Sequence, residues 1–219
     1  MLDRVKKIMY DLKIPLILSI SLVVFHVTTY YLVKFTPFEA QIVGDNIFDS
    51  SIPFMPEWTI FYVLWHPLLI ITPCILYKLN KSDFYTYIVV KFFIEFIAIF
   101  IFFFYPTLFI RPEFEVKDIF TWFLNLVYIT DTPALNCLPS MHCTVCFTSI
   151  YAFVKSNKIG KKCKAFFSII FIGIILSTLF VKQHAIMDVV TAFLLTLIVS
   201  LVTYKFKLDK KFERYIEKK

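Results

Sequence analysis

Four polar side chains in this sequence have the types that phosphate-ester chemistry requires. Arg111, His142, His184 and Asp188 each lie at an end of a long apolar segment. A guanidinium binds phosphate through two parallel hydrogen bonds. An imidazole whose tautomer is fixed by a carboxylate can act as a nucleophile or carry a proton. The four residues therefore predict a site that binds and cleaves a phosphate ester, provided that the segments bring them together.

Two neighbouring residues extend this candidate site. Ser140 follows Pro139 directly before an apolar segment, a place where serine is typical of a helix N-cap. The free backbone N–H groups of such a helix start bind phosphate without further help, and they would lie beside His142. Lys182 lies two residues before His184 and adds a second candidate cation.

The segments that must position these residues are those of a membrane protein. The chain has 219 residues, of which 59% are hydrophobic and 19% aromatic, whereas a soluble domain is about 45–50% apolar. Continuous rather than alternating apolar runs favour helices over a β-barrel. We therefore predict an all-α polytopic membrane protein in a single domain, residues 1–219. Six runs are candidate spans, the fourth of which needs its flanks to cross: 14–35, 59–78, 84–110, 141–155, 165–181 and 186–205.

The loops of this predicted bundle differ in character. Residues 117–130, between the third and fourth spans, have aromatic and aliphatic positions at helical spacing, which predicts a short interfacial helix. Asp131 and Pro133 are expected to end it. The first apolar segment is too long for a cleavable signal peptide, and no small-residue cleavage site follows it.

The net charge of +7 is distributed as membrane topology requires. Eighteen of the 23 Lys and Arg residues lie in four stretches, and the opposite loops carry mainly acids. The positive-inside rule then places both termini in the cytoplasm of a cell and the candidate site at the extracytoplasmic surface of its membrane. Topology and attraction to anionic headgroups account for the basic stretches without a nucleic-acid partner. They are residues 4–13, 78–81, 155–164 and 205–219.

Each candidate residue alone also has a purely structural interpretation. Arg111 could anchor a helix at the membrane surface, and His142 could be a helix-end histidine bonded to a loop. Lys182 could simply extend its amine toward the headgroups. Their coincidence in one leaflet favours a site, because ionisable residues in or near spans are unfavourable and tend to be functional.

Other polar residues in the spans are expected to serve packing. The Cys143-x-x-Cys146 pair has no second ligand pair, which favours small apolar packing over a redox or metal role. Lys91 and Glu95, four residues apart, predict a self-neutralising ion pair, with a functional role as the alternative. The remaining histidines of the spans are expected to be packing or kink residues: His26 and His66.

Taken in order, these motifs resemble those of the type 2 phosphatidic acid phosphatase superfamily of membrane lipid phosphatases. That family carries the motifs K-x6-R-P, P-S-G-H and S-R-x5-H-x3-D. Arg111-Pro112 matches the end of the first motif. The others are matched by Pro139-Ser140-x-His142 and by Ser177-x6-His184-x3-Asp188. Six spans and motifs at the outer ends of spans three to six also agree, so the resemblance covers nearly the whole chain.

The sequence departs from the family pattern at two cationic positions. Phe104 stands at the Lys of the first motif, and Thr178 stands at the Arg of the third. Lys182 is the candidate replacement for one of them. The stretch 131–142 is similar to the branch that includes inositol phosphorylceramide synthases and related bacterial proteins, which also relaxes these positions. Phosphatase and phosphotransferase therefore both remain open.

The resemblance implies a mechanism and a substrate class. His184, oriented by Asp188, would attack phosphorus and form a phosphohistidine, while His142 protonates the leaving group. The substrate would be an extracytoplasmic lipid phosphate or diphosphate, with headgroup transfer or a non-catalytic carrier or scaffold as alternatives. We expect neither a metal nor a cofactor, because no acidic cluster of metal-ligand type accompanies the histidines. The sequence leaves the lipid and the oligomeric state open. The expected phosphate-binding residues are Arg111, Ser140 and Lys182.

Overall fold

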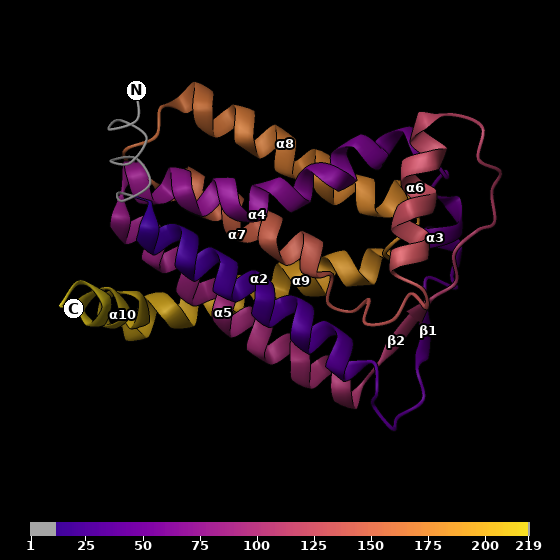
Figure 1. Cartoon of the computed structure of the whole chain (residues 1–219), viewed down its shortest axis with the longest axis horizontal. Helices are drawn as coiled ribbons and strands as arrows, with labels where there is room; N and C mark the ends of the chain where they lie inside the picture. Colours follow the sequence, from indigo (N-terminus) through magenta and orange to yellow (C-terminus); the bar gives the residue numbers. More distant parts are fainter. Residues whose placement is uncertain (1–11, 219) are drawn as a thin grey trace.

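The chain forms a bundle of helices whose long axes run in roughly one direction (Figure 1). The structure is a computed structural model that describes residues 12–218. Within that range five helices are long and apolar enough to cross a membrane, which confirms a multi-pass, predominantly helical membrane protein. They are α2 (Lys13–Val33), α4 (Thr59–Leu79, preceded by the 3-10 turn η1, Pro56–Trp58), α5 (Lys81–Phe104), α8 (Lys161–Phe180) and α9 (Ile186–Phe206).

The fourth predicted span is shorter than the others. Helix α7 (Met141–Lys155) has 15 residues, about 22 Å at 1.5 Å per residue, against a hydrocarbon core of about 30 Å. It packs against α5, α8 and α9, and most of its residues are buried. This central position explains its composition: the hydroxyls of Thr144, Thr148 and Ser149 bond carbonyls of α7 itself and do not face lipid.

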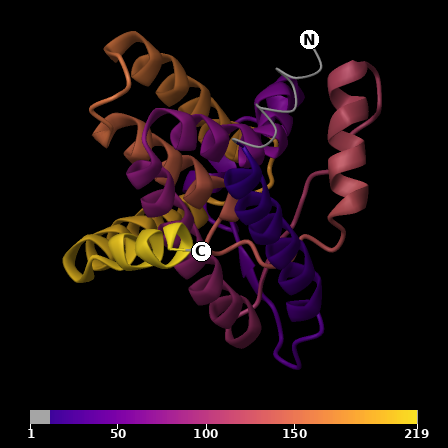
Figure 2. The same cartoon turned by 60° about the vertical axis from the view of Figure 1, so that its left-hand side comes forward.

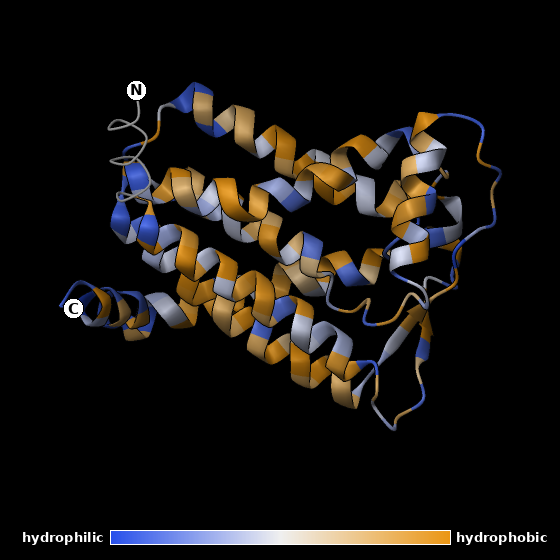
Figure 3. Cartoon of the chain, in the orientation of Figure 1, coloured by the Kyte–Doolittle hydropathy of each residue, from blue (hydrophilic) through white to orange (hydrophobic). Residues whose placement is uncertain are grey.

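Successive long helices run in opposite directions, so the start of α2 and the end of α9 lie at the same end of the bundle (Figure 1). Hydrophilic residues gather at the two ends and hydrophobic ones between them (Figure 3). The amphipathic helix α10 (Leu208–Glu217) was not predicted from the sequence. It packs on α5 at the end of the bundle where α2 begins. Lys81 pairs with Glu217 at 3.0 Å, and the hydroxyl of Thr86 donates to Asp209 at 2.8 Å. The basic stretch 4–13 lies almost entirely outside the described residues.

The opposite end contains two short strands that the all-α prediction did not include. Helix α5 ends at Phe104 and not near residue 110, because Pro106 has no N–H to continue it. Strand β2 (Thr107–Phe109) pairs in parallel with β1 (Gln41–Val43). The other edge of β2 is hydrogen-bonded to the loop before α7: Phe109 N donates to the carbonyl of Ala134 at 3.1 Å.

Helix α6 (Ile119–Thr130) confirms the helix predicted over residues 117–130. Asp118 caps it by accepting from Thr121 N, and Asp131 ends it. The helix lies at the side of the bundle (Figure 2), where its Leu124 packs against Tyr62 and Val181. Its apolar side chains Ile119 and Ile129 are more than half exposed, as expected for a helix that contacts lipid at the membrane surface.

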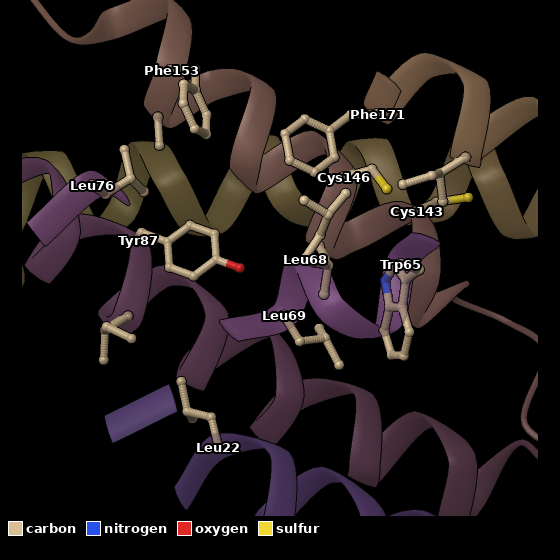
Figure 4. Close-up of a cluster of buried hydrophobic side chains, with 14 of the residues drawn as sticks. Leu22, Trp65, Leu68, Leu69, Leu76, Tyr87, Cys143, Cys146, Phe153 and Phe171 are labelled. Carbon is tan, nitrogen blue, oxygen red and sulfur yellow. The ribbon is translucent and has the colours of Figure 1, made fainter. Parts of the chain in front are cut away.

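The core lies between α4, α5, α7 and α8 (Figure 4). Cys143 and Cys146 are fully buried in it, beside Leu68 and Phe171. This placement agrees with the packing role expected for the two cysteines. The core fixes the start of α7, and thereby His142, against α4.

Candidate active site

His184 and Asp188 form the buried centre of the site. His184 lies in the turn between α8 and α9, and Asp188 lies in the first turn of α9. The Asp188 Oδ2 accepts from Ala185 N at 2.8 Å and lies 3.2 Å from His184 Nδ1. Because α9 begins at Ile186, the pair meets across a helix start and does not lie along one helix face. The carboxylate holds Nδ1 as an N–H donor and leaves Nε2 of His184 for chemistry.

His142 extends this pair into a chain of two imidazoles and a carboxylate. It lies in the first turn of α7, and its Nδ1 is 3.4 Å from His184 Nε2. Its ring packs against Trp65 and Tyr62 of α4, with centroid separations of 4.3 and 4.7 Å. The two aromatic contacts orient the imidazole. The structure therefore brings together the two histidines that the sequence predicted to converge.

Ser140 is the N-cap of α7, as predicted. Its Oγ accepts from Cys143 N at 3.3 Å, and its backbone N–H donates to the carbonyl of Asp188 at 3.1 Å. The residue is fully buried. Ser140 thus joins the start of α7 to the start of α9, which sets the spacing of His142 and His184.

Arg111 follows β2 and is held by several groups at once. One guanidinium nitrogen donates to the Asp131 carbonyl at 2.9 Å, and the other lies 2.5 Å from the Asp131 carboxylate. The latter nitrogen also bonds the side-chain oxygen of Gln183, the residue before His184. The guanidinium carbon lies 4.7 Å from the centroid of the Tyr128 ring. Arg111 is therefore beside the histidines but already paired.

Asp131 is the centre of a charged cluster. From the sequence, this residue was expected only to end a helix. Its carboxylate also accepts from the hydroxyl of Tyr30 and pairs with Lys34 at 3.4 Å, both from the end of α2. One carboxylate thus neutralises part of the charge of two cations. No spacing rule reveals this cluster, because its members come from the end of α2, the segment after β2 and the loop after α6.

A cavity of about 270 Å³ opens beside the histidines. Asp131 and Gln183 line it, whereas Arg111 does not, so these two side chains lie between the guanidinium and the cavity. A phosphate in the cavity reaches Arg111 only by displacing them. The wall is otherwise formed by α2, α4 and the loop before α7, and its lining includes His26, Tyr30, Tyr62, Trp65, His142 and His184.

Lys182 faces away from this cavity. Its amine donates to the carbonyls of Asp49 and Ile52, at 2.9 and 2.7 Å, in and after the short helix α3 (Ile47–Ser51). Burial lowers the pKa of Lys182, and the Asp49 charge partly offsets this. Lys182 is not among the described residues that line the cavity. The structure thus places it as a clamp between α3 and the α8–α9 turn, in contrast to the phosphate-binding position expected for it.

Among the described residues, one group of buried side chains could hold a metal ion. Cys137, His184 and Asp188 offer ligand atoms that lie within 4.8 Å of one another. The Cys137 thiol, however, donates to the Ala134 carbonyl at 3.2 Å, and burial raises its pKa. A thiol held protonated is a poor ligand, because metals bind the thiolate. A metal bound here would therefore have to displace the thiol proton and its bond to the Ala134 carbonyl.

Comparison with known proteins identifies one family. The model of the PAP2 superfamily matches residues 84–212. No curated protein and no solved structure matches the chain. The matched region contains Arg111, Ser140, His142, His184 and Asp188. It excludes α2 and α4, which provide one wall of the cavity, including Trp65.

Proposed function

Because the chain belongs to the PAP2 superfamily, with its phosphatase- or phosphotransferase-type activity on lipid phosphates, we propose that it is a metal-independent lipid phosphate phosphatase. The observation that carries the proposal is the buried chain from Asp188 through His184 to His142 at the edge of a cavity. The substrate is a lipid phosphate or diphosphate, and residues 1–219 act as one integral membrane domain.

The proposed reaction begins with in-line attack of His184 Nε2 on phosphorus. The bond from phosphorus to the lipid oxygen breaks, and His142 donates its proton to that oxygen. His142 then takes a proton from water, whose oxygen attacks the phosphohistidine and releases phosphate. Asp188 stabilises the positive charge that His184 acquires during both steps. The 3.4 Å contact between the imidazoles is too short to admit a phosphoryl group, so the substrate replaces it on binding.

The phosphate oxygens need donors, and those nearest the histidines are the proposed ones. The first backbone N–H groups of α7 lie beside His142, at the positive end of the helix dipole, and Ser140 caps this helix. Arg111 joins them once Asp131 gives way, and its planar guanidinium then binds two oxygens. Lys182 would have to leave the α3 carbonyls to take part.

The orientation in the membrane follows from charge. The ends of α2 and α9 that lie together carry the basic stretches, and we propose that they face the cytoplasm. The histidines then lie at the extracytoplasmic end of the helices. The lipid tail is proposed to leave the cavity sideways between α2 and α4, the two helices that form its apolar wall.

Headgroup transfer is a second candidate, and one observation favours it. Asp131 neutralises part of the charge of Arg111 and Lys34, and Phe104 and Thr178 occupy the other cationic positions of the family. A phosphodiester carries one negative charge, whereas a phosphomonoester carries about two at neutral pH. The reduced positive charge of the site suits the diester. A non-catalytic carrier remains a third candidate.

A single assay separates these candidates. Purified protein in detergent is given a panel of lipid phosphates and phosphodiesters with chelator present, and both free phosphate and exchanged headgroup are measured. We expect phosphate release by the wild type and a loss of at least about 10³-fold in His184→Ala. Thr191→Ala is the matched control, because Thr191 lies one turn beyond Asp188 and bonds only its own helix.

Headgroup exchange without phosphate release would instead support the transferase. Undiminished turnover in His184→Ala would refute the proposed nucleophile. A carrier role predicts that the His142→Ala and His184→Ala proteins retain the biological phenotype of the wild type.

A further inference from the structure

A second imidazole–carboxylate pair lies in the membrane interior of the protein. His26 of α2 and Glu95 of α5 are in contact, with Nδ1 and Oε1 2.7 Å apart. The Glu95 side chain is 3% exposed and that of His26 18%. The sequence had predicted that Glu95 pairs with Lys91. Among residues 12–218, however, no carboxylate lies within ion-pair distance of the Lys91 amine, and Glu95 instead turns to the neighbouring helix.

His26 lines the same cavity as the two proposed catalytic histidines. The indole of Trp65 contacts both His26 and His142: its ring centroid lies 6.2 Å from that of His26 and 4.3 Å from that of His142. His26 lies seven residues before Val33, the last residue of α2, and so about 10 Å from the end of the helix. The cavity therefore has polar groups on two walls, with His142 and His184 at helix starts and His26 within α2.

One polar atom on this wall of the cavity is free to bind a ligand. The described part of the chain supplies a partner for Nδ1 of His26 but not for its Nε2. The indole N–H of Trp65 also has no acceptor there, but this atom is itself inaccessible and so cannot bind a ligand in the cavity. Buried polar groups are nearly always paired in folded proteins. An imidazole fixed by a buried carboxylate has one nitrogen committed to the protein and the other presented to the cavity.

We infer that His26, oriented by Glu95, binds the polar backbone of the lipid substrate, a hydrogen-bonding group located a few bonds from the phosphate. The inference rests on the proposed function and narrows its substrate class. Ester carbonyls of a diacylglycerol phosphate and the amide or hydroxyl of a ceramide phosphate offer such a group. A polyprenyl phosphate does not, because the phosphate is followed directly by hydrocarbon.

The physical basis for this discrimination is the unpaired group. When a polyprenyl chain fills the cavity, the His26 Nε2 loses water without gaining a partner. A site built to hydrogen-bond a substrate rejects the analogue that lacks the group more strongly than an apolar pocket rejects a change of size. His26 is thus a specificity residue, and it does not take part in the bond exchange at phosphorus.

The experiment compares three lipids in the same detergent micelles: dioleoyl phosphatidate, ceramide 1-phosphate and phytanyl phosphate. Hydrolysis and equilibrium binding of each are measured for the wild type, His26→Leu and Thr28→Leu. Thr28 is the matched control, since it is an exposed polar residue of α2 and is not part of the described lining of the cavity. We expect the wild type to prefer phosphatidate or the ceramide lipid by about tenfold, and His26→Leu to abolish that preference while its phytanyl phosphate activity stays within about twofold.

Each outcome decides the question. The relative rates on phosphatidate and the ceramide lipid show which backbone group is bound. An equal loss on all three lipids in His26→Leu would identify a merely structural histidine and overturn the inference. If His26→Leu fails to fold, the wild type decides, because equal use of the three lipids contradicts a polar subsite. If the wild type hydrolyses none, the proposed function fails, and the binding measurements still test His26.

Discussion

The Asp188–His184 contact permits a substitution that removes charge and keeps geometry. Oδ2 alone accepts from both Ala185 N and His184 Nδ1, whereas Oδ1 is buried without a partner among the described residues. In Asp188→Asn the amide oxygen can occupy the Oδ2 position and keep both contacts. The reversed amide would set its NH₂ against two N–H donors, so the Ala185 N–H selects the productive orientation.

The expected loss follows from the charge alone. A hydrogen bond to an ionised group contributes about 1.5–3 kcal/mol and a neutral one about 0.5–1.5 kcal/mol, so the retained neutral contact is weaker by about 1–1.5 kcal/mol. Each 1.36 kcal/mol is about tenfold in rate, and Asp188→Asn should therefore lower kcat by about 5- to 13-fold. Asp188→Ala also frees the imidazole to adopt the wrong tautomer, and a loss of about 10⁴-fold is expected.

The assay is phosphate release from a lipid phosphate under saturating substrate, with the thermal unfolding temperature of each variant measured in the same detergent. Thr191→Ala should match the wild type in both. If Asp188→Asn is as inactive as Asp188→Ala while remaining folded, the amide does not preserve the geometry, and the assignment of both contacts to one oxygen is refuted.

Four further predictions test other parts of the structure. Asp131→Asn should lower the KM for a phosphomonoester by about tenfold, because Arg111 and Lys34 lose their competing carboxylate; an unchanged or higher KM would contradict its shielding role. Lys182→Met should lower the unfolding temperature by several degrees through two unpaired carbonyls, with kcat reduced less than about threefold; a selective loss of kcat would instead place the amine at the phosphate. Because burial lowers the pKa of Lys182, the unfolded chain binds more protons than the folded one at pH values between the lowered pKa and about 10.5. This group therefore makes the free energy of unfolding rise with pH in that window. The slope should be absent from thermal unfolding of Lys182→Met. A membrane-impermeant maleimide should label the exposed Cys163 only from the cytoplasmic side, whereas the buried Cys137, Cys143 and Cys146 stay unlabelled in the folded protein; labelling from outside would invert the proposed orientation.

Several elements of the fold were predictable because lipid enforces a simple rule. Every backbone group in the hydrocarbon core must be paired, so long apolar runs become helices with few exceptions. With that rule, the ends of four helices were predicted to within a few residues: α2, α4, α8 and α9. It failed at residues 105–110, which are apolar but form the strand β2, because Pro106 and pairing with β1 outweigh hydropathy.

The candidate site likewise has residues whose positions could be predicted from the sequence and one whose orientation could not. Residue types and spacing identified His142, His184, Asp188 and the Ser140 cap, since each belongs to a helix start that local sequence dictates. The orientation of Lys182 could not be predicted, because the carbonyls that bind its amine come from α3, more than a hundred residues away.

The sequence by itself determined the membrane environment of this protein, the approximate course of its long helices and the residue types of its candidate site, because these depend on local composition and on short spacing. Only the tertiary structure decided which charges meet. Asp131 covers Arg111, and Glu95 turns from Lys91 to His26, because a side chain in a low-dielectric interior pairs with whatever partner the packed helices bring within a few ångströms. That choice depends on helix packing, which spacing along one segment does not encode.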